Sequence, residues 1–311
     1  MSLIIFLFLY LFGVGLSYKN VLIVIISAIV ALLILGILLS LFIVPSDGTF
    51  TGLFGNVALI EIKGEILSTS TFNATNAFDV VDAIDRADKD VTVSAILLEI
   101  NSPGGSVVAT RQIVEKIRET KKPVVAWISD IGTSGAYYVA SACDLVIADE
   151  HSITGSIGAV SIVWNFSEML EKLGIKVDVL KEGKYKGMAS IFTELTPEER
   201  KIIEGMLKQV YEGFKGDILK FRGGKINKTR FEQVADGRLL TGKQALDYGL
   251  IDELGSREYA IKRAGELAGL KKPNIKRYTT EPTLQNLLFN AGYSFGQGMK
   301  SALSNQFFTI R

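Results

Sequence analysis

The chain has 311 residues, a formal net charge of +1, one cysteine and one histidine. The near-neutral charge balance gives no support to nucleic-acid binding, which usually relies on a basic patch. The single cysteine excludes an internal disulfide and a cysteine-based metal cluster, and the single histidine excludes a histidine-rich metal site. The length leaves room for a membrane segment together with one large domain or two small ones.

The N-terminal segment, residues 1–44, is strongly apolar. Residues 21–44 hold no charged side chain and are long enough to cross about 30 Å of hydrocarbon as a helix. A shorter apolar run at residues 3–16 precedes them, so we expect one transmembrane helix or a hairpin of two. Lys19 lies between the two runs and would mark the cytoplasmic side. This orientation predicts a protein of the cell membrane whose remaining chain lies outside the cytoplasm.

After a polar linker at residues 45–56, stretches with strand and helix patterns alternate. Apolar runs and two-residue alternation predict strands at 57–63, 93–100, 124–129, 144–148, 155–163 and 175–180. Helical spacing, capping residues and stop signals predict helices at 76–87, 107–120, 135–142, 166–173, 196–221, 241–248 and 257–267. This alternation is typical of βαβ units around a parallel sheet. We therefore expect one α/β domain over residues 57–270 and leave 271–311 as a C-terminal tail.

A serine stands at the turn between the predicted strand 124–129 and the predicted helix 135–142. The hydroxyl of Ser134 would be pushed out of the fold there, with the N–H groups of the helix start beside it. Oriented N–H groups stabilise the negative charge that develops when a hydroxyl attacks a carbonyl. The sequence therefore suggests a nucleophile at this turn, although a serine in this position can also simply cap the helix.

A glycine-rich turn, Pro103-Gly104-Gly105, follows the buried strand predicted at 93–100. Glycines let the backbone approach a ligand closely and their N–H groups can point at an oxyanion, but the same residues also form ordinary turns. Because the carboxyl ends of parallel strands meet at one edge of a sheet, this turn and Ser134 are expected at the same edge.

A serine nucleophile needs a base, and the only histidine is a poor candidate. His151 lies in a polar turn and is not expected to be catalytic. A lysine can act as the base when burial lowers the pKa of its amine. The loop 180–187 follows a predicted strand and carries three lysines, two of which we expect at the surface. A Ser–Lys pair is therefore the economical solution for this chain.

Several stretches of the chain resemble the family of signal peptide peptidase A in its short, membrane-anchored form. Each motif is weak alone, but together they follow the family's order over residues 57–265. The matching stretches are Asn101-Ser102-Pro103-Gly104-Gly105, Gly132-Thr133-Ser134-Gly135-Ala136-Tyr137-Tyr138, Ile153-Thr154-Gly155-Ser156-Ile157-Gly158, Ala235-Asp236-Gly237-Arg238, Thr241-Gly242-Lys243-Gln244-Ala245 and Gly249-Leu250-Ile251-Asp252-Glu253-Leu254-Gly255.

The resemblance implies a Clp protease/crotonase-like fold of repeated ββα and βαβ units and a serine endopeptidase with a Ser–Lys dyad. By this resemblance Ser134 is the nucleophile, Lys186 is the catalytic lysine and Ser156 orients its amine. The N–H groups of Gly105 and Gly135 correspond to the oxyanion hole. Lys181 and Lys184 are then surface residues, and neither a metal nor an organic cofactor is needed.

The same resemblance implies peptide substrates, namely signal-peptide remnants and other apolar segments released at the membrane, and a ring-like homo-oligomer. Three alternatives remain at this point. The chain could be a stomatin-type membrane protein processing protease, which shares the dyad. It could be a crotonase-like acyl-CoA enzyme, which uses two N–H groups against a thioester without a Ser–Lys pair. It could also be a membrane scaffold that keeps the fold without using it for catalysis.

Overall fold

A computed structural model of the chain describes residues 26–32, 35, 55–71 and 73–278. Contacts divide the chain into two units, Met1–Phe54 and Gly55–Arg311. In the first unit residues 26–32 are helical, and none of the helices within the described ranges is both long and apolar enough to span a bilayer. Most of the predicted membrane segment, nearly all of the linker 45–56 and the tail beyond residue 278 lie outside the described residues.

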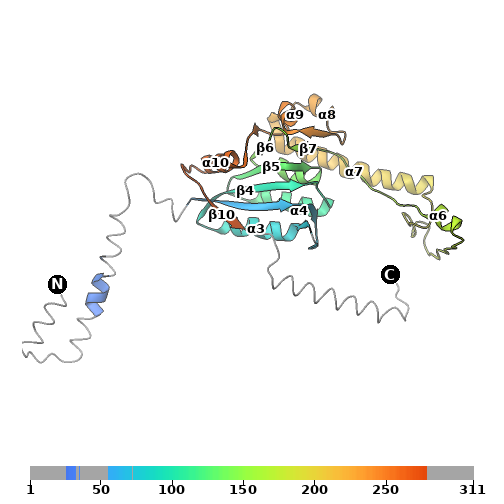
Figure 1. Ribbon diagram of the computed structural model, residues 1–311, viewed down its shortest axis with the longest axis horizontal. Coiled ribbons are helices and arrows are strands. Elements are labelled where there is room, and N and C mark those ends of the chain that lie inside the picture. The colour runs from blue at the N-terminus through green and yellow to red at the C-terminus, as the bar shows by residue number, and fades with distance from the viewer. Residues whose placement is uncertain (1–25, 33–34, 36–54, 72, 279–311) are drawn as a thin grey trace, which may run out of the picture. The chain divides into compact units, whose positions relative to one another are not determined.

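The second unit is built around a sheet with the strand order β10-β1-β4-β5-β6-β9, in which every neighbouring pair is parallel (Figure 1). Short β7 continues the sheet beside the end of β5 and pairs antiparallel with β8. A separate parallel pair is formed by β2 and β3. The strands are β1 Asn56–Lys63, β2 Glu65–Leu67, β3 Ala74–Asn76, β4 Val93–Ser102, β5 Val124–Thr133, β6 Leu145–Ala148, β7 Ile153–Gly155, β8 Leu239–Thr241, β9 Glu253–Leu254 and β10 Asn274–Tyr278.

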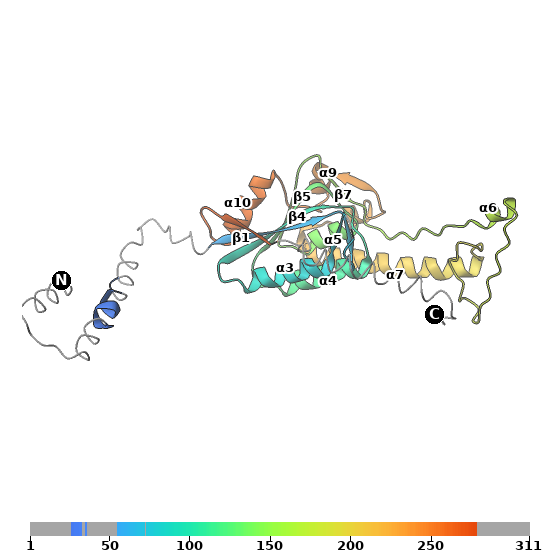
Figure 2. The same cartoon turned by 60° about the horizontal axis from the view of Figure 1, so that its bottom comes forward.

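Helices cover both faces of the sheet because successive residues of a strand point to opposite faces. On one face Ala58, Ile60 and Ile62 of β1 pack in the core with α3, α4, α5 and the end of α7. On the other face Val57 and Leu59 pack with α10, and Figure 2 shows α10 opposite α3 and α4. The helices are α3 Ala77–Lys89, α4 Val107–Glu119, α5 Gly135–Ser141, α6 Ser167–Lys172, α7 Pro197–Arg222, α8 Lys228–Glu232, α9 Gly242–Asp247 and α10 Arg257–Leu267, with the 3₁₀ turn η2 Gly223–Lys225. The predicted α/β class with a parallel sheet is confirmed.

The segment between β7 and α7 differs from the sequence prediction. We expected strands at 155–163 and 175–180, but β7 ends at Gly155 and residues 175–180 form no regular element. In this second stretch, two of the alternating apolar side chains are partly exposed, Val177 at 42% and Val179 at 38%. A strand needs a neighbouring strand to receive its backbone hydrogen bonds, and the described part of the chain offers none to residues 175–180. Apolar alternation predicted the wrong structure here.

Helix α7, which passes beside the candidate site, is capped at its start and anchored to the sheet at its end. It begins with the predicted capping box, in which Thr196 and Glu199 bond each other's backbone N–H and Pro197 occupies the first turn. At its last residue the Arg222 guanidinium forms two 2.9 Å hydrogen bonds to the Asp252 carboxylate. The Arg222 side chain is 1% exposed, so the pair fixes α7 against the sheet through β6 and β9.

We expect Asp252→Asn to lower the free energy of unfolding by about 3 kcal/mol, because it leaves the buried Arg222 charge without its partner. Burial favours the protonated form of Asp252, but the hydrogen bonds and charge of Arg222, with help from Lys225, hold its pKa below the usual value. A lowered pKa contributes stability above the unfolded value of about 4, and this contribution is lost as the pH falls further.

Urea unfolding of both proteins between neutral and acidic pH measures this contribution. The difference between wild type and Asp252→Asn should shrink as the solution becomes acidic. The matched control is Asp247→Asn on α9, an exposed aspartate whose replacement is expected to change stability by less than about 0.5 kcal/mol. Equal stability of Asp252→Asn and wild type at neutral pH would contradict the anchoring role.

Candidate active site

Ser134 stands between the end of β5 and the start of α5 in a conformation that few residues other than glycine adopt. Its φ is +53° and its ψ is −123°. The backbone is held on both sides, since its N–H donates to the Gly155 carbonyl at 2.9 Å and its carbonyl accepts from the Tyr138 N–H at 2.9 Å. The side chain makes no capping bond to α5, which argues against the cap interpretation, and it lines a cleft. The strained turn therefore presents the hydroxyl to open space.

Two backbone N–H groups lie beside this hydroxyl. Gly105 lies opposite Ile66 in a parallel bridge. The Ile66 N–H donates to the Gly104 carbonyl and the Ser106 N–H donates to the Ile66 carbonyl, so the bridge does not use the Gly105 N–H. A Cβ built on Gly135 would come within 3.4 Å of the Gly105 nitrogen. Among the described residues no acceptor is seen for either N–H, so both donors near Ser134 could bind an oxyanion.

Close contacts with neighbouring backbone require glycine at the turn predicted from the sequence. Gly104 has a φ of +99°, and a Cβ there would lie 2.7 Å from the Gly135 nitrogen and 3.0 Å from the Ser134 Cβ. A Cβ on Gly105 would lie 2.1 Å from the Ile66 carbonyl oxygen. A side chain on Gly104 would press against the Gly135 nitrogen and Ser134, whereas one on Gly105 would collide with the Ile66 backbone. Both positions therefore require glycine because of close contacts that an ordinary turn does not impose.

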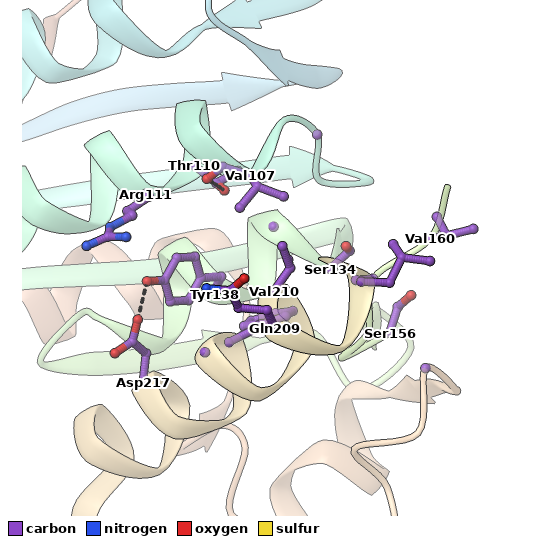
Figure 3. A pocket seen from close by; sticks show the side chains of 18 residues that line it. Val107, Thr110, Arg111, Ser134, Tyr138, Ser156, Val160, Gln209, Val210 and Asp217 are labelled. Carbon is purple, nitrogen blue, oxygen red and sulfur yellow. Dashed lines mark hydrogen bonds between the residues drawn. The ribbon is translucent and has the colours of Figure 1, made fainter. Parts of the chain in front are cut away.

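Ser156 is brought to the same place by strand register. β5 and β7 run parallel with Thr133 opposite Gly155, and Ser134 and Ser156 are the residues that follow this pair. Ser156 also has a positive φ of +51°, and its N–H donates to the Arg238 carbonyl at 2.7 Å. Both serines line the cleft, and Figure 3 shows their hydroxyls on the same side of it.

The cleft has a volume of about 700 Å³ and is formed by α4, α5, α7 and residues near Ala159. Its apolar walls come from α4 and α7 and consist of Val107, Leu207, Val210 and Phe214. On the side of the cleft away from Ser134 lie three polar side chains, those of Arg111, Tyr138 and Asp217 (Figure 3). The Tyr138 hydroxyl donates to the Asp217 carboxylate at 2.5 Å, and burial together with this bond raises the pKa of Tyr138.

The wall supplied by α7 was missed by the sequence prediction. Leu207, Val210, Phe214 and Asp217 follow one another at helical spacing of three or four residues, so they share one face of the helix. An aspartate that ends an otherwise apolar stripe is a recognisable sign that the stripe lines a site. The spacing alone could not say that this stripe faces an open cleft instead of the core.

Lys186 does not line the cleft. Its side chain is exposed, and its N–H closes a turn with the Gly183 carbonyl at 3.1 Å. The neighbouring Lys184 forms a 2.7 Å ion pair with Glu198 in the first turn of α7. From Glu198 to the cleft residue Val210 the helix rises about 18 Å. Within one chain, therefore, the lysine loop and Ser134 lie beside different parts of α7, as the separation of α6 from α5 in Figure 2 also shows.

The other candidate bases also lie outside the cleft. His151 is exposed and lies 3.5 Å from Glu150, which agrees with its dismissal from the sequence. Lys181 lies on the exposed loop near Gly187, and its charge acts on Glu199 at the start of α7. Of the predicted site residues the structure thus brings together Ser134, Ser156, Gly105 and Gly135, and it keeps the lysines apart from them. In the described residues no cluster of His, Cys, Asp or Glu could hold a metal ion.

Comparison with known proteins gives two family matches. Residues 116–271 match the family described as "Peptidase family S49", and residues 57–150 match the one described as "Clp protease". "Putative protease MJ0651" of Methanocaldococcus jannaschii is 36% identical over 227 residues, which cover 72% of each chain. "Putative protease slr0021" of Synechocystis is 35% identical and covers 72% of this chain and 79% of its own. "Serine protease SPPA, chloroplastic" of Arabidopsis thaliana is 32% identical over 71% of this chain and 33% of its own.

We expect Ser134→Gly to be about 1 kcal/mol more stable than Ser134→Ala, because glycine relieves the cost of the positive φ and alanine keeps it. Both variants lack the hydroxyl, so both should be inactive. Thermal unfolding of the pair measures the difference.

Ser106, which precedes α4 with a φ of −60°, provides the matched control. There the stability difference between Ser106→Gly and Ser106→Ala should be smaller than at Ser134, because both serines precede a helix, where glycine is preferred to alanine, but only Ser134 is strained. An equal difference at both positions would show that the Ser134 turn is not strained.

Proposed function

The chain belongs to peptidase family S49 and is a serine peptidase, and from this premise we propose that it cleaves peptide bonds with a Ser–Lys dyad of Ser134 and Lys186. The observation that carries the proposal is the strained, uncapped Ser134 beside the two free N–H groups of Gly105 and Gly135. This arrangement fits acyl transfer, since it combines a nucleophile with donors for the oxyanion. The family match favours peptide hydrolysis over the acyl-CoA chemistry considered from the sequence.

In the proposed mechanism the uncharged amine of Lys186 takes the proton of Ser134 while Oγ attacks the substrate carbonyl carbon. The carbonyl oxygen becomes an oxyanion that accepts hydrogen bonds from Gly105 and Gly135. The C–N bond then breaks, and the lysine gives its proton to the leaving amine. A water molecule next attacks the acyl-enzyme, with its proton passing to the amine, and release of the acid returns that proton to Ser134. Ser156 holds the amine toward the nucleophile.

The dyad needs a lysine from outside the cleft of a single chain, and we assign it to a second copy. The segment between β7 and α7 carries strongly exposed apolar side chains, among them Val160 at 83%, Trp164 at 63% and Leu180 at 95%. Exposed apolar surface of this kind is typical of protein interfaces. A homo-oligomer in which this segment covers the cleft of the next copy would bury these side chains and bring Lys186 to Ser134. The rise of about 18 Å along α7 between the lysine loop and the cleft is too large for a small shift of the loop. It therefore supports a lysine from a partner copy.

Membrane anchoring and the choice of substrate are further parts of the proposal. The uncharged run at 21–44 supports an N-terminal anchor in the cell membrane, with the peptidase domain outside the cytoplasm. An anchored peptidase meets peptides released at the membrane at a high local concentration. We therefore assign signal-peptide remnants and other membrane-derived peptides as substrates.

Ser134→Ala and Lys186→Ala are each expected to lower kcat/KM by at least about 1,000-fold, because each removes one member of a cooperating pair. Hydrolysis of a fluorogenic peptide measures the loss. The matched control is Lys184→Ala, which removes a lysine two residues away that is already paired with Glu198 and should keep its activity. Near-full turnover by Lys186→Ala would exclude this lysine as the base.

Co-expression of the two inactive chains, each with its own affinity tag, tests the origin of the lysine. Assemblies that contain both tags should regain part of the wild-type activity, because one chain supplies Ser134 and the other Lys186. Mixed assemblies without activity would show that both residues act within the same chain.

A lysine base also predicts the pH dependence of the reaction. Only the uncharged amine can accept the serine proton, so kcat/KM should rise from neutral toward alkaline pH. A pH profile of the wild type measured with an uncharged peptide tests this. A decline of activity over the same range would contradict a lysine base.

A further inference from the structure

The cleft beside Ser134 changes character with distance from the nucleophile. Next to Ser134 its walls are apolar, with Val107 from α4 and Val210 from α7. Tyr138 lies one turn further along α5, about 6 Å by helical rise. Its hydroxyl meets Asp217 of α7, so the cleft ends in polar groups (Figure 3).

The Asp217 carboxylate places a negative charge at this end of the cleft, and no lysine or arginine of the described residues forms an ion pair with it. Its Oδ2 accepts the Tyr138 hydroxyl at 2.5 Å, and among the described residues it forms no ion pair. Nearby Lys215 is paired with Glu232 at 2.6 Å, so that amine is engaged elsewhere. A partly buried carboxylate with one neutral partner keeps the capacity to bind a cation strongly.

Arg111 also lines the cleft and has to be considered as a partner of Asp217. Its Nε donates to the Glu115 carboxylate at 2.9 Å, one turn further along α4. Both of these side chains are largely exposed, at 68% and 59%. The Arg111 charge is therefore balanced on its own helix, and the net charge left at the polar end of the cleft is that of Asp217.

We propose that this cleft is a specificity pocket for a lysine or arginine side chain at the substrate residue whose carbonyl Ser134 attacks, the P1 residue. The methylene stem of such a side chain would lie against the apolar walls, and its charged end would meet the Asp217 carboxylate. Lysine and arginine combine an apolar stem with a charged end in this order. Asp217 is thus assigned as a specificity-determining residue, an inference that rests on the proposed peptidase function.

The pocket defines the substrates more closely than as apolar peptides, because it also calls for a basic P1 residue. Basic residues flank the apolar segments of membrane proteins and the apolar core of signal peptides. A basic P1 residue would direct cleavage to the border of such a segment and not to its middle. The simpler alternative is that the Tyr138–Asp217 bond only joins α5 to α7, in which case the charge of Asp217 would not affect the choice of substrate.

Peptides that are identical except for P1 separate these alternatives. Norleucine has the stem of lysine without the amine, and glutamate carries the opposite charge. For the wild-type enzyme we expect kcat/KM to be about tenfold higher with lysine than with norleucine, and lowest with glutamate. Added salt should reduce the preference for lysine, because it screens the charge. An equal or higher kcat/KM with norleucine would overturn the inference without any need for a variant.

Asp217→Asn tests the residue itself, because asparagine can still accept the Tyr138 hydroxyl but carries no charge. The lysine-to-norleucine ratio should fall toward one in this variant. The matched control is Glu212→Gln, which removes a charge from an exposed position of α7 outside the cleft and should keep the wild-type ratio. An unchanged ratio in Asp217→Asn would overturn the assignment. Absence of cleavage of every peptide by the wild type would instead contradict the proposed function.

Discussion

The proposed chemistry of this protein depends on how the backbone of Ser134 is held. The parallel pairing of β5 with β7 places the Gly155 carbonyl against the Ser134 N–H, and the first turn of α5 takes up the Ser134 carbonyl. Between these two hydrogen bonds the residue is kept at a positive φ that serine rarely adopts. The surrounding sheet and helix supply the free energy that this strain costs, and the result is a hydroxyl directed into the cleft beside two unused N–H groups.

Helix α7 connects the parts of the molecule that the proposed reaction needs. Its end is fixed to the sheet by Arg222 and Asp252, its middle forms a wall of the cleft, and its start lies beside the loop that carries Lys186. A long helix with these three roles keeps Ser134 and Lys186 of one chain apart. It thereby makes assembly of several copies a condition for the proposed dyad, in keeping with the exposed apolar side chains around α6.

The cleft also links specificity to the fold. Tyr138 is part of the short helix that positions Ser134, and Asp217 is part of the helix that carries the opposite wall. Their hydrogen bond joins the two helices and at the same time places a carboxylate at the end of an apolar cleft. The proposed recognition of a basic side chain therefore follows from the same contact that keeps the cleft walls together.

Local patterns in the sequence were enough to predict the features that depend on neighbouring residues. The buried strands, the capping box at Thr196, the glycine turn before α4 and the serine between β5 and α5 all follow from local patterns of polarity, capping and turn chemistry. Which of these local features come into contact depends on the folded chain as a whole. Ser156 reaches Ser134 through strand register, Asp217 reaches the cleft through the packing of α7, and Lys186 stays away from both. The expected strand at 175–180 does not form, since pairing between strands depends on partners far away in the chain, which local polarity does not encode.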